Sequence, residues 1–235
     1  MHRYEHRHRA LAMGLAMLAG FVDALGFLQL GGLFVSFMSG NSTRLAVGTV
    51  AGSPAAPLAA GLILSFIAGV TGGVLAGQAA GRWRKQAVLA LVTLLLATAA
   101  TMASIAGPRP VVVTFVMAAA MGVANDVFLR DGEVSIGVTY MTGALVKLGQ
   151  NLARTLTGGP LLAWLPHLLL WLSLVGGAIG GAAVYPALGL GALWIATAIA
   201  ALLLAAAFAI GPASPSGSRL VTTAPGSVAA HWRRP

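Results

Sequence analysis

Apolar stretches about twenty residues long follow one another along almost the whole chain, from residue 10 to residue 210. A helix needs about 20 such residues to cross a hydrocarbon core roughly 30 Å thick. Of the 235 residues, 58% are hydrophobic and 8% are charged, and the mean hydropathy is +0.88. A soluble domain has about a quarter charged residues. We therefore expect an all-α, polytopic transmembrane helix bundle in contact with the lipid bilayer.

The chain divides into full spans, two special segments and two tails. Segments 31–50 and 134–156 carry polar residues within apolar sequence, and we expect each to be a broken or re-entrant helix. Residues 1–9 form a basic cytoplasmic N-terminal tail, and residues 212–235, rich in Pro, Ser, Gly and Thr, are expected to be disordered. Six stretches are expected to cross fully, at about residues 10–30, 58–80, 87–106, 111–129, 161–184 and 188–210.

The two special segments are related in sequence. Adding 103 to the residue number maps Asp23 onto Asp126 and Gly40 onto Gly143. The same shift aligns S-F-M-S-G with T-Y-M-T-G, so that an acid, a hydroxyl-aromatic-Met-hydroxyl-Gly run and a base keep one spacing. This pattern predicts an internal duplication, with residues 10–106 and 107–211 as two transmembrane repeats.

The distribution of positive charge predicts the orientation. If both special segments enter and leave on one side and the N-terminus is cytoplasmic, six internal Lys and Arg residues lie inside and two outside. Cytoplasmic connections carry the excess of Lys and Arg, which favours this arrangement of three spans per half and hence inverted halves. Eight spans in parallel repeats are the alternative, with four charges on each side. The six are Arg82, Arg84, Lys85, Arg130, Lys147 and Arg154, against Arg44 and Arg109.

The polar middle of each special segment is the candidate site. Gly40 is a poor interior helix residue, whereas Ser39, Asn41 and Ser42 are good N-caps, so we expect the helix to break near Gly40 and its counterpart near Gly143. Irregular backbone survives in hydrocarbon only beside protein or a water-filled cavity. Helix N-termini just after both glycines would favour an anion there. The expected substrate or ion path comprises Asp23, Ser39, Gly40, Asn41, Arg44, Asp126, Thr142, Gly143 and Lys147.

The two aspartates lie about two-thirds along their spans. A charge at such depth costs about 2.5–3.5 kcal/mol on insertion scales and marks a functional candidate. Three roles stay open. Asp23 and Asp126 could take up and release a proton or gate the path. They could form fixed pairs with Arg44 or Lys147, or Asp126 could pair with Arg130 one turn further along its helix.

Glycines recur at four-residue spacing in two of the spans. Such a stripe gives a smooth helix face on which a neighbouring helix can approach closely, so we expect a packing role. The stripes are Gly69, Gly73, Gly77 and Gly81 in one span, and Gly176, Gly177, Gly180 and Gly181 in the other.

Several classes of function are excluded by what the sequence lacks. There is no cysteine, hence no disulfide, thiolate metal site or cysteine nucleophile. Signatures of zinc proteases, serine hydrolases and P-loop proteins are missing, and F-V-D-A-L-G and A-N-D-V-F-L do not match intramembrane aspartic proteases. We expect no enzyme, cofactor or metal site. The net charge of +9 is concentrated at the termini and short connections, as orientation signals are, so nucleic acid is not an expected partner. A homo-oligomer is left open.

The run from Gly20 to Gly48, G-F-V-D-A-L-G-F-L-Q-L-G-G-L-F-V-S-F-M-S-G-N-S-T-R-L-A-V-G, resembles the signature of the YoaK family of small bacterial multi-pass membrane proteins. The run T-Y-M-T-G-A-L-V-K-L-G, residues 139–149, is similar to that family's second motif. The resemblance covers most of residues 10–210 and implies a bacterial cytoplasmic membrane location. It implies no catalytic or binding role, because the family is uncharacterised.

From the duplicated polar segments, the leading hypothesis is a transporter or channel for a small anionic solute. The alternative is a non-transporting membrane scaffold or partner-binding subunit. In that case the acids, bases and glycines would only hold the helices together.

Overall fold

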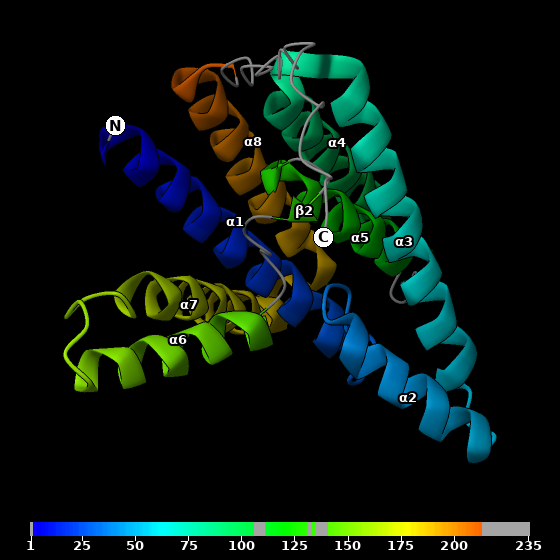
Figure 1. Ribbon diagram of the computed structural model, residues 1–235. Coiled ribbons are helices and arrows are strands. Elements are labelled where there is room, and N and C mark those ends of the chain that lie inside the picture. Colours follow the sequence, from blue (N-terminus) through cyan, green and yellow to red (C-terminus); the bar gives the residue numbers. More distant parts are fainter. Residues whose placement is uncertain (1, 106–110, 131–132, 135–140, 213–235) are drawn as a thin grey trace, which may run out of the picture.

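The computed structural model describes residues 2–105, 111–130, 133–134 and 141–212. Eight α-helices lie in this part of the chain (Figure 1): α1 (His2–Gln29), α2 (Met38–Val50), α3 (Ala55–Ala80), α4 (Arg84–Ile105), α5 (Val111–Ala124), α6 (Met141–Leu156), α7 (Leu165–Leu188) and α8 (Leu193–Ile210). Shorter elements are the 3-10 turns η1 (Gly81–Trp83), η2 (Asn125–Phe128) and η3 (Gly189–Ala192), and the antiparallel pair β1 (Leu129–Arg130) and β2 (Glu133–Val134).

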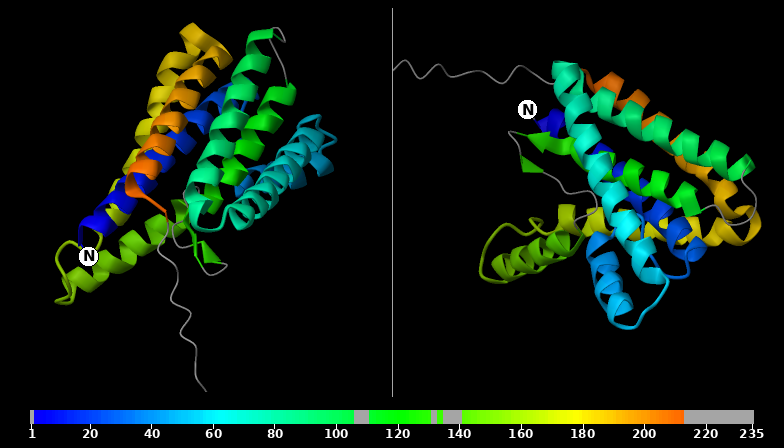
Figure 2. Two further views of the ribbon diagram at one scale, coloured as in Figure 1. Left: turned by 90° about the horizontal axis from the view of Figure 1, so that it is seen from above. Right: turned by 90° about the vertical axis from the view of Figure 1, so that its right-hand side faces the viewer.

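Four continuous helical stretches of the described chain are long and apolar enough to cross a membrane: 7–29, 55–105, 111–128 and 165–210. Two of them contain two helices each. The chain turns back between α3 and α4 at Gly81, with φ 54°, and between α7 and α8 at Gly189, with φ 53°, a backbone conformation that glycine adopts without a steric penalty. The predicted polytopic helical bundle is thereby confirmed. Helices α2 and α6 project from it (Figures 1 and 2).

The two halves of the chain interlock. Helix α1 packs along α7, α3 packs along α5, and α4 packs along both α5 and α8. Each of the two most extensive of these contacts therefore joins a helix of the first half to a helix of the second. The core lies between α1, α4 and α5, where Leu15, Leu96 and Met117 are fully enclosed.

Glycines set the closest approaches between these helices. A Cβ atom built on Gly177 in α7 would lie 1.9 Å from the Met17 carbonyl oxygen in α1, and one on Gly69 in α3 would lie 2.1 Å from the Ala119 carbonyl oxygen in α5. Real Cβ atoms essentially never come within 3.0 Å of another heavy atom. The packing role predicted for the two stripes is confirmed at these positions, since any side chain would push the helix backbones apart.

In both interfaces the partner helix also contributes a glycine that lies against the backbone of the first. A Cβ atom on Gly20 in α1 would lie 2.0 Å from the Leu174 carbonyl oxygen in α7, and one on Gly122 in α5 would lie 2.2 Å from the Phe66 carbonyl oxygen in α3. The α1–α7 and α5–α3 interfaces therefore close in the same way, with a glycine of each helix against the backbone of its partner.

Two of the striped glycines do not pack as predicted. Gly81 ends α3 in a left-handed conformation, and a Cβ atom there or on Gly176 would meet nothing within 4 Å. The first stripe thus ends at Gly77, because the chain leaves the α3–α5 interface one turn later.

One end of the bundle gathers the positive charge. The side chains of His8 in α1 and Lys85 in α4 are in contact, and the Gln86 amide donates hydrogen bonds to the carbonyl oxygens of Ala207 (3.0 Å) and Gly211 (3.2 Å) at the end of α8. The starts of α1 and α4 and the end of α8 therefore lie together. We call this the basic end, after Arg7, His8, Arg9, Arg82, Arg84 and Lys85.

Some predicted segment boundaries differ from the structure, and others lie outside the described residues. Helix α1 begins at His2, so the basic stretch predicted as a tail continues the first helix. The turn predicted at residues 107–110 and the tail from residue 213 lie outside the described residues.

Candidate functional site

The first special segment is irregular before α2 begins, over residues 30–37. Gly31 and Gly32 have φ values of 64° and 110°, which let the chain reverse directly after α1. The Val35 side chain then packs over Gly26, with its Cγ1 atom 2.6 Å from where a Cβ atom of that glycine would lie. The segment thus runs back along the last turns of α1 before α2 starts at Met38.

Asp23 holds this irregular backbone from the side of α1. Its Oδ1 atom accepts hydrogen bonds from the backbone N–H groups of Val35 (2.9 Å) and Ser36 (2.8 Å). Both of those residues are buried. Hydrogen bonds to a carboxylate are stronger than those between neutral groups, and an unpaired N–H group in an apolar environment is costly. The carboxylate therefore stabilises a backbone that no helix satisfies.

Asn41 holds the same backbone from the side of α2. The Asn41 side chain is 0% exposed; its Oδ1 atom accepts from the Phe34 N–H group (2.9 Å), and its Nδ2 atom donates to the Phe34 carbonyl oxygen (2.6 Å). This two-way pairing replaces the bonds that a neighbouring strand would make. Asp23 and Asn41 together fix residues 34–36.

The predicted helix breaks at the two glycines are wrong. Helix α2 is continuous through Gly40, and α6 is continuous through Gly143; the helices begin at Met38 and Met141. The irregular backbone lies before α2 because Asp23 and Asn41 satisfy it there.

Gly40 and its neighbours also have roles other than the predicted ones. A Cβ atom on Gly40 would lie 2.6 Å from a ring carbon of Phe37, so a larger residue there would make this ring shift. The predicted caps do not form: Phe37 precedes the helix without a side-chain cap, and the Ser42 hydroxyl donates to the Met38 carbonyl oxygen (2.8 Å).

In the second half, Asp126 has a different environment. It lies in η2 with 1% of its surface exposed, and its Oδ2 atom has no hydrogen-bond partner among the described residues. A Cβ atom on Gly73 would lie 2.2 Å from this oxygen, so the glycine leaves the space that the carboxyl group fills.

The basic residue that interacts electrostatically with Asp126 is Arg84, at the start of α4. Its Nε and Nη2 atoms are buried and without hydrogen-bond partners within the described chain, and Nε lies 3.2 Å from where a Cβ atom of Gly77 would be. Gly73 and Gly77, one turn apart on α3, therefore leave room for the side chains of Asp126 and Arg84 next to each other. Arg84 is not among the residues predicted from the sequence, although its place in R-W-R-K, directly after the glycine stripe, was the available signal. The predicted contact with Arg130 involves a side chain outside the described residues.

The remaining predicted path residues lie on exposed faces of α2 and α6. The Arg44 side chain is exposed, with Nη2 2.8 Å from the Cβ position of Gly32, so it covers the turn after α1. Figures 1 and 2 show that α2 and α6 both begin near the middle of the molecule and run away from each other, α2 packed against α3 and α6 against α7. The other exposed path residues are Ser39, Thr142, Gly143 and Lys147.

The structure thus groups the three predicted site residues that lie inside the protein in two places. Asp23 and Asn41 meet around residues 34–36, whereas Asp126 lies with Arg84 between α3 and α4. Asp23 binds backbone N–H groups, and no ion pair joins it to Arg44 or Lys147 within the described chain.

A multi-pass helical bundle with polar groups at two buried places defines the class: an integral membrane protein. A family model described as protein of unknown function (DUF1275) matches residues 11–206, so the chain belongs to that family. A UPF0700 transmembrane protein of Rhizobium meliloti (strain 1021) is 42% identical over 206 residues, covering 86% of each chain. No solved structure matches the chain. As the resemblance implied, the family is an uncharacterised one of membrane proteins.

Proposed function

We propose that this protein is a transporter or channel for a small anionic solute, acting without covalent chemistry in the bacterial cytoplasmic membrane. The observation that supports it best is that α2 and α6 both begin toward the middle of the molecule and run away from each other (Figure 1). The first N–H groups of a helix have no intrahelical partner and carry partial positive charge. Two such ends around one region favour an anion, as in transporters with discontinuous helices.

The arrangement of the halves supports two inverted repeats of three spans. The α1–α7 and α5–α3 interfaces close through equivalent glycine contacts, at Gly20 and Gly122. The R-W-R-K connection and the N-terminus share the basic end, which we place in the cytoplasm in agreement with the positive-inside rule. Asp126 lies beside Arg84 at that end, whereas Asp23 lies near the opposite end of α1, six residues before Gln29. Inversion of one half relative to the other accounts for these opposite positions.

In this proposal the path residues have different tasks. Asp23 and Asn41 hold the irregular segment that aims α2, and the exposed Arg44 and Lys147 attract the solute. Asp126 is the gating group, because its Oδ2 atom and the Nε and Nη2 atoms of Arg84 are buried side by side and have no hydrogen-bond partners among the described residues. Ser39, Gly40, Thr142 and Gly143 line the path beside the two helix starts.

The test is solute flux into liposomes containing the purified protein, measured for a panel of small inorganic and organic anions. Arg44→Ala and Lys147→Ala are expected to lower flux at least fivefold with little change in thermal stability, because both side chains are exposed. Thr49→Ala is the matched control, since Thr49 is exposed in the last turn of α2 and its hydroxyl donates only to the Leu45 carbonyl oxygen. Unaltered flux in both basic variants, or no flux of any anion, would overturn the proposal.

The second candidate is a non-transporting membrane scaffold. It is favoured by one observation: Asp23 and Asn41 are both occupied by backbone groups, as purely structural residues would be. A thermal-shift screen with small anions separates the two functions, because a ligand that binds only the folded protein raises its apparent stability. A transporter is expected to show a shift that Arg44→Ala abolishes. A scaffold is expected to show none, and the same substitution would impair assembly with its partner.

A further inference from the structure

A groove runs between the start of α1 and the end of α8 at the basic end, and no part of the proposed anion path reaches it. Its volume is about 470 Å³, within the usual range for ligand pockets, and its walls include Ala10 and Leu11 on α1 and Ala206 and Ile210 on α8. Arg7 is the charged residue among those lining it. The groove is thus apolar along its length with a guanidinium group at one point.

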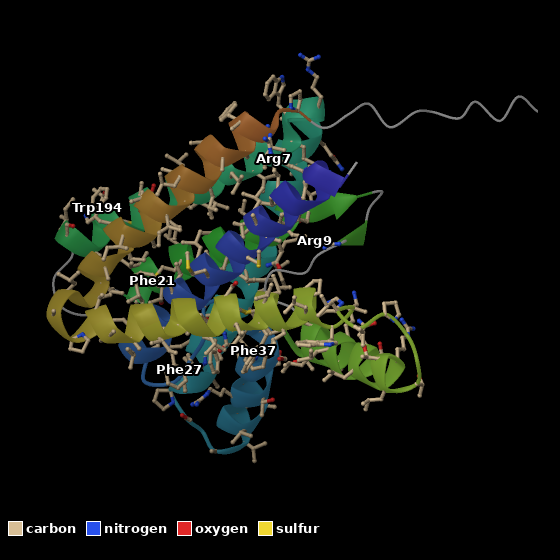
Figure 3. All side chains as sticks on the ribbon, turned by 90° about the vertical axis from the view of Figure 1, so that its left-hand side faces the viewer. Arg7, Arg9, Phe21, Phe27, Phe37 and Trp194 are labelled. Carbon is tan, nitrogen blue, oxygen red and sulfur yellow. The ribbon has the colours of Figure 1, made fainter. Side chains whose placement is uncertain are left out.

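The groove ends toward the middle of the bundle, and Arg7 lies at its other end. Leu203 of α8 packs over Gly14 of α1, where a Cβ atom would lie 2.5 Å from Cδ2 of that leucine. Gly14 lies two turns beyond Arg7, about 10 Å along the helix. Figure 3 shows Arg7 and Arg9 near the start of α1, far from Phe27 and Phe37 near the opposite end of that helix. The arginine therefore marks the mouth of the groove.

Residues near this mouth are of the kinds that gather at the level of lipid headgroups. Trp83 and Phe208 pack with ring centroids 5.9 Å apart, and the guanidinium carbon of Arg82 lies 5.7 Å from the centroid of the Trp83 ring. Aromatic rings gather at membrane–water interfaces, and Lys and Arg at the cytoplasmic surface attract anionic lipid. An apolar groove at this depth, with positive charge at its mouth, is complementary to one acyl chain joined to a phosphate.

We propose that the groove between α1 and α8 binds an anionic phospholipid, with an acyl chain along Ala10 and Ala206 and the headgroup phosphate beside Arg7. The lipid fills the groove between α1 and α8 at the basic end. This inference concerns a different face from the anion path and stands whether or not the protein transports anything.

The full-length protein is titrated with fluorescent phosphatidylglycerol and, separately, phosphatidylcholine in neutral detergent, and bound lipid is counted by native mass spectrometry. Phosphatidylglycerol is expected to bind at least about fivefold more tightly, as one basic residue near the surface contributes about that factor. Arg7→Gln is expected to remove the preference, while the control Arg154→Gln, at the end of α6, leaves it intact. Ala206→Phe fills the groove and is expected to weaken both lipids, unlike Ala201→Phe on the exposed surface of the same helix.

Four outcomes would overturn the proposal. Equal affinity for the two lipids, or no effect of Arg7→Gln, would show that Arg7 does not bind the lipid headgroup. Displacement of lipid by inorganic phosphate at constant ionic strength would indicate a free-phosphate site. A change of oligomeric state in Ala206→Phe with lipid binding unaltered would identify the groove as a contact between copies of this chain. Arg7 and Ala206 are exposed, so neither substitution is expected to change the melting temperature. An unchanged melting temperature would show that both variants are folded.

Discussion

The segments around Asp23 and Asp126 share a sequence pattern and differ in structure. At Asp23 the carboxylate accepts two backbone hydrogen bonds, and the Asn41 amide completes the set from α2. At Asp126 one carboxylate oxygen is buried without a partner within the described residues and lies against Gly73. Ala144 replaces Asn41 in the second half, so the amide that holds the first segment has no counterpart there.

This difference indicates that two segments with an aspartate at corresponding positions can have different roles. The Asp23 carboxylate is held in place by the hydrogen bonds it accepts, whereas the Oδ2 atom of Asp126 and two nitrogens of Arg84 make none within the described part of the chain. We infer that the first half is the rigid part of the proposed site and the second half is the part that rearranges.

The largest effect is expected from Asp23→Ala. The N–H groups of Val35 and Ser36 would lose their acceptor in a buried place, at a loss of about 3 kcal/mol in unfolding free energy. Asp23→Asn keeps one neutral hydrogen-bond acceptor, so its unfolding free energy is expected to fall by less. The measurement is reversible unfolding in mixed micelles. A loss below about 1 kcal/mol in Asp23→Ala would remove the contrast between the two aspartates.

Asn41→Ala is expected to cost about 2 kcal/mol, since it deletes both hydrogen bonds to the Phe34 backbone at a fully buried position. Ser42→Ala is the control, as the neighbouring hydroxyl is exposed and bonds only to its own helix, and it is expected to be near neutral. Amide hydrogen exchange of residues 34–36 should accelerate in the first variant alone. Equal exchange rates in the two variants would contradict the assigned role.

Gly73→Ala tests the seat of Asp126 and is expected to cost about 1–2 kcal/mol, because the new methyl group would overlap the carboxyl oxygen. The matched control is Gly72→Ala, one residue earlier on α3, where a Cβ atom meets nothing within 4 Å. That control is expected to be neutral or slightly stabilising, since alanine favours helix more than glycine does. Thermal unfolding of the two variants side by side gives the comparison. Equal melting temperatures would show that Asp126 does not occupy the space beside Gly73.

The smallest effect is expected in the coupling energies of two double-mutant cycles. These energies test the difference between the two aspartates most directly. A double-mutant cycle of Asp126→Asn with Arg84→Gln is expected to give about 1 kcal/mol of interaction, because the two charges lie together between α3 and α4. The cycle of Asp23→Asn with Arg44→Gln is expected to give none, as Asp23 binds backbone groups instead. Coupling in the second cycle and not the first would reverse the interpretation of the two halves.

Much of the fold could be predicted from sequence because its determinants are local. Length and hydropathy of the apolar stretches define membrane helices whatever their neighbours are. Four-residue glycine spacing likewise defines a smooth face, and Gly69 and Gly177 make the close approaches that such faces permit. The start of α2 could not be placed this way, since Gly40 is as compatible with a break as with packing against Phe37.

The sequence by itself determined that this chain is a bundle of membrane helices with polar groups set into two of its segments. Only the tertiary structure decided which groups these polar side chains meet: Asp23 and Asn41 hold the backbone of residues 34–36, and Asp126 lies beside Arg84. The physical reason is range. Hydrophobicity and helical period act over a few residues, whereas a hydrogen bond or charge pair depends on where chain reversals at Gly32 and Gly81 bring distant groups together.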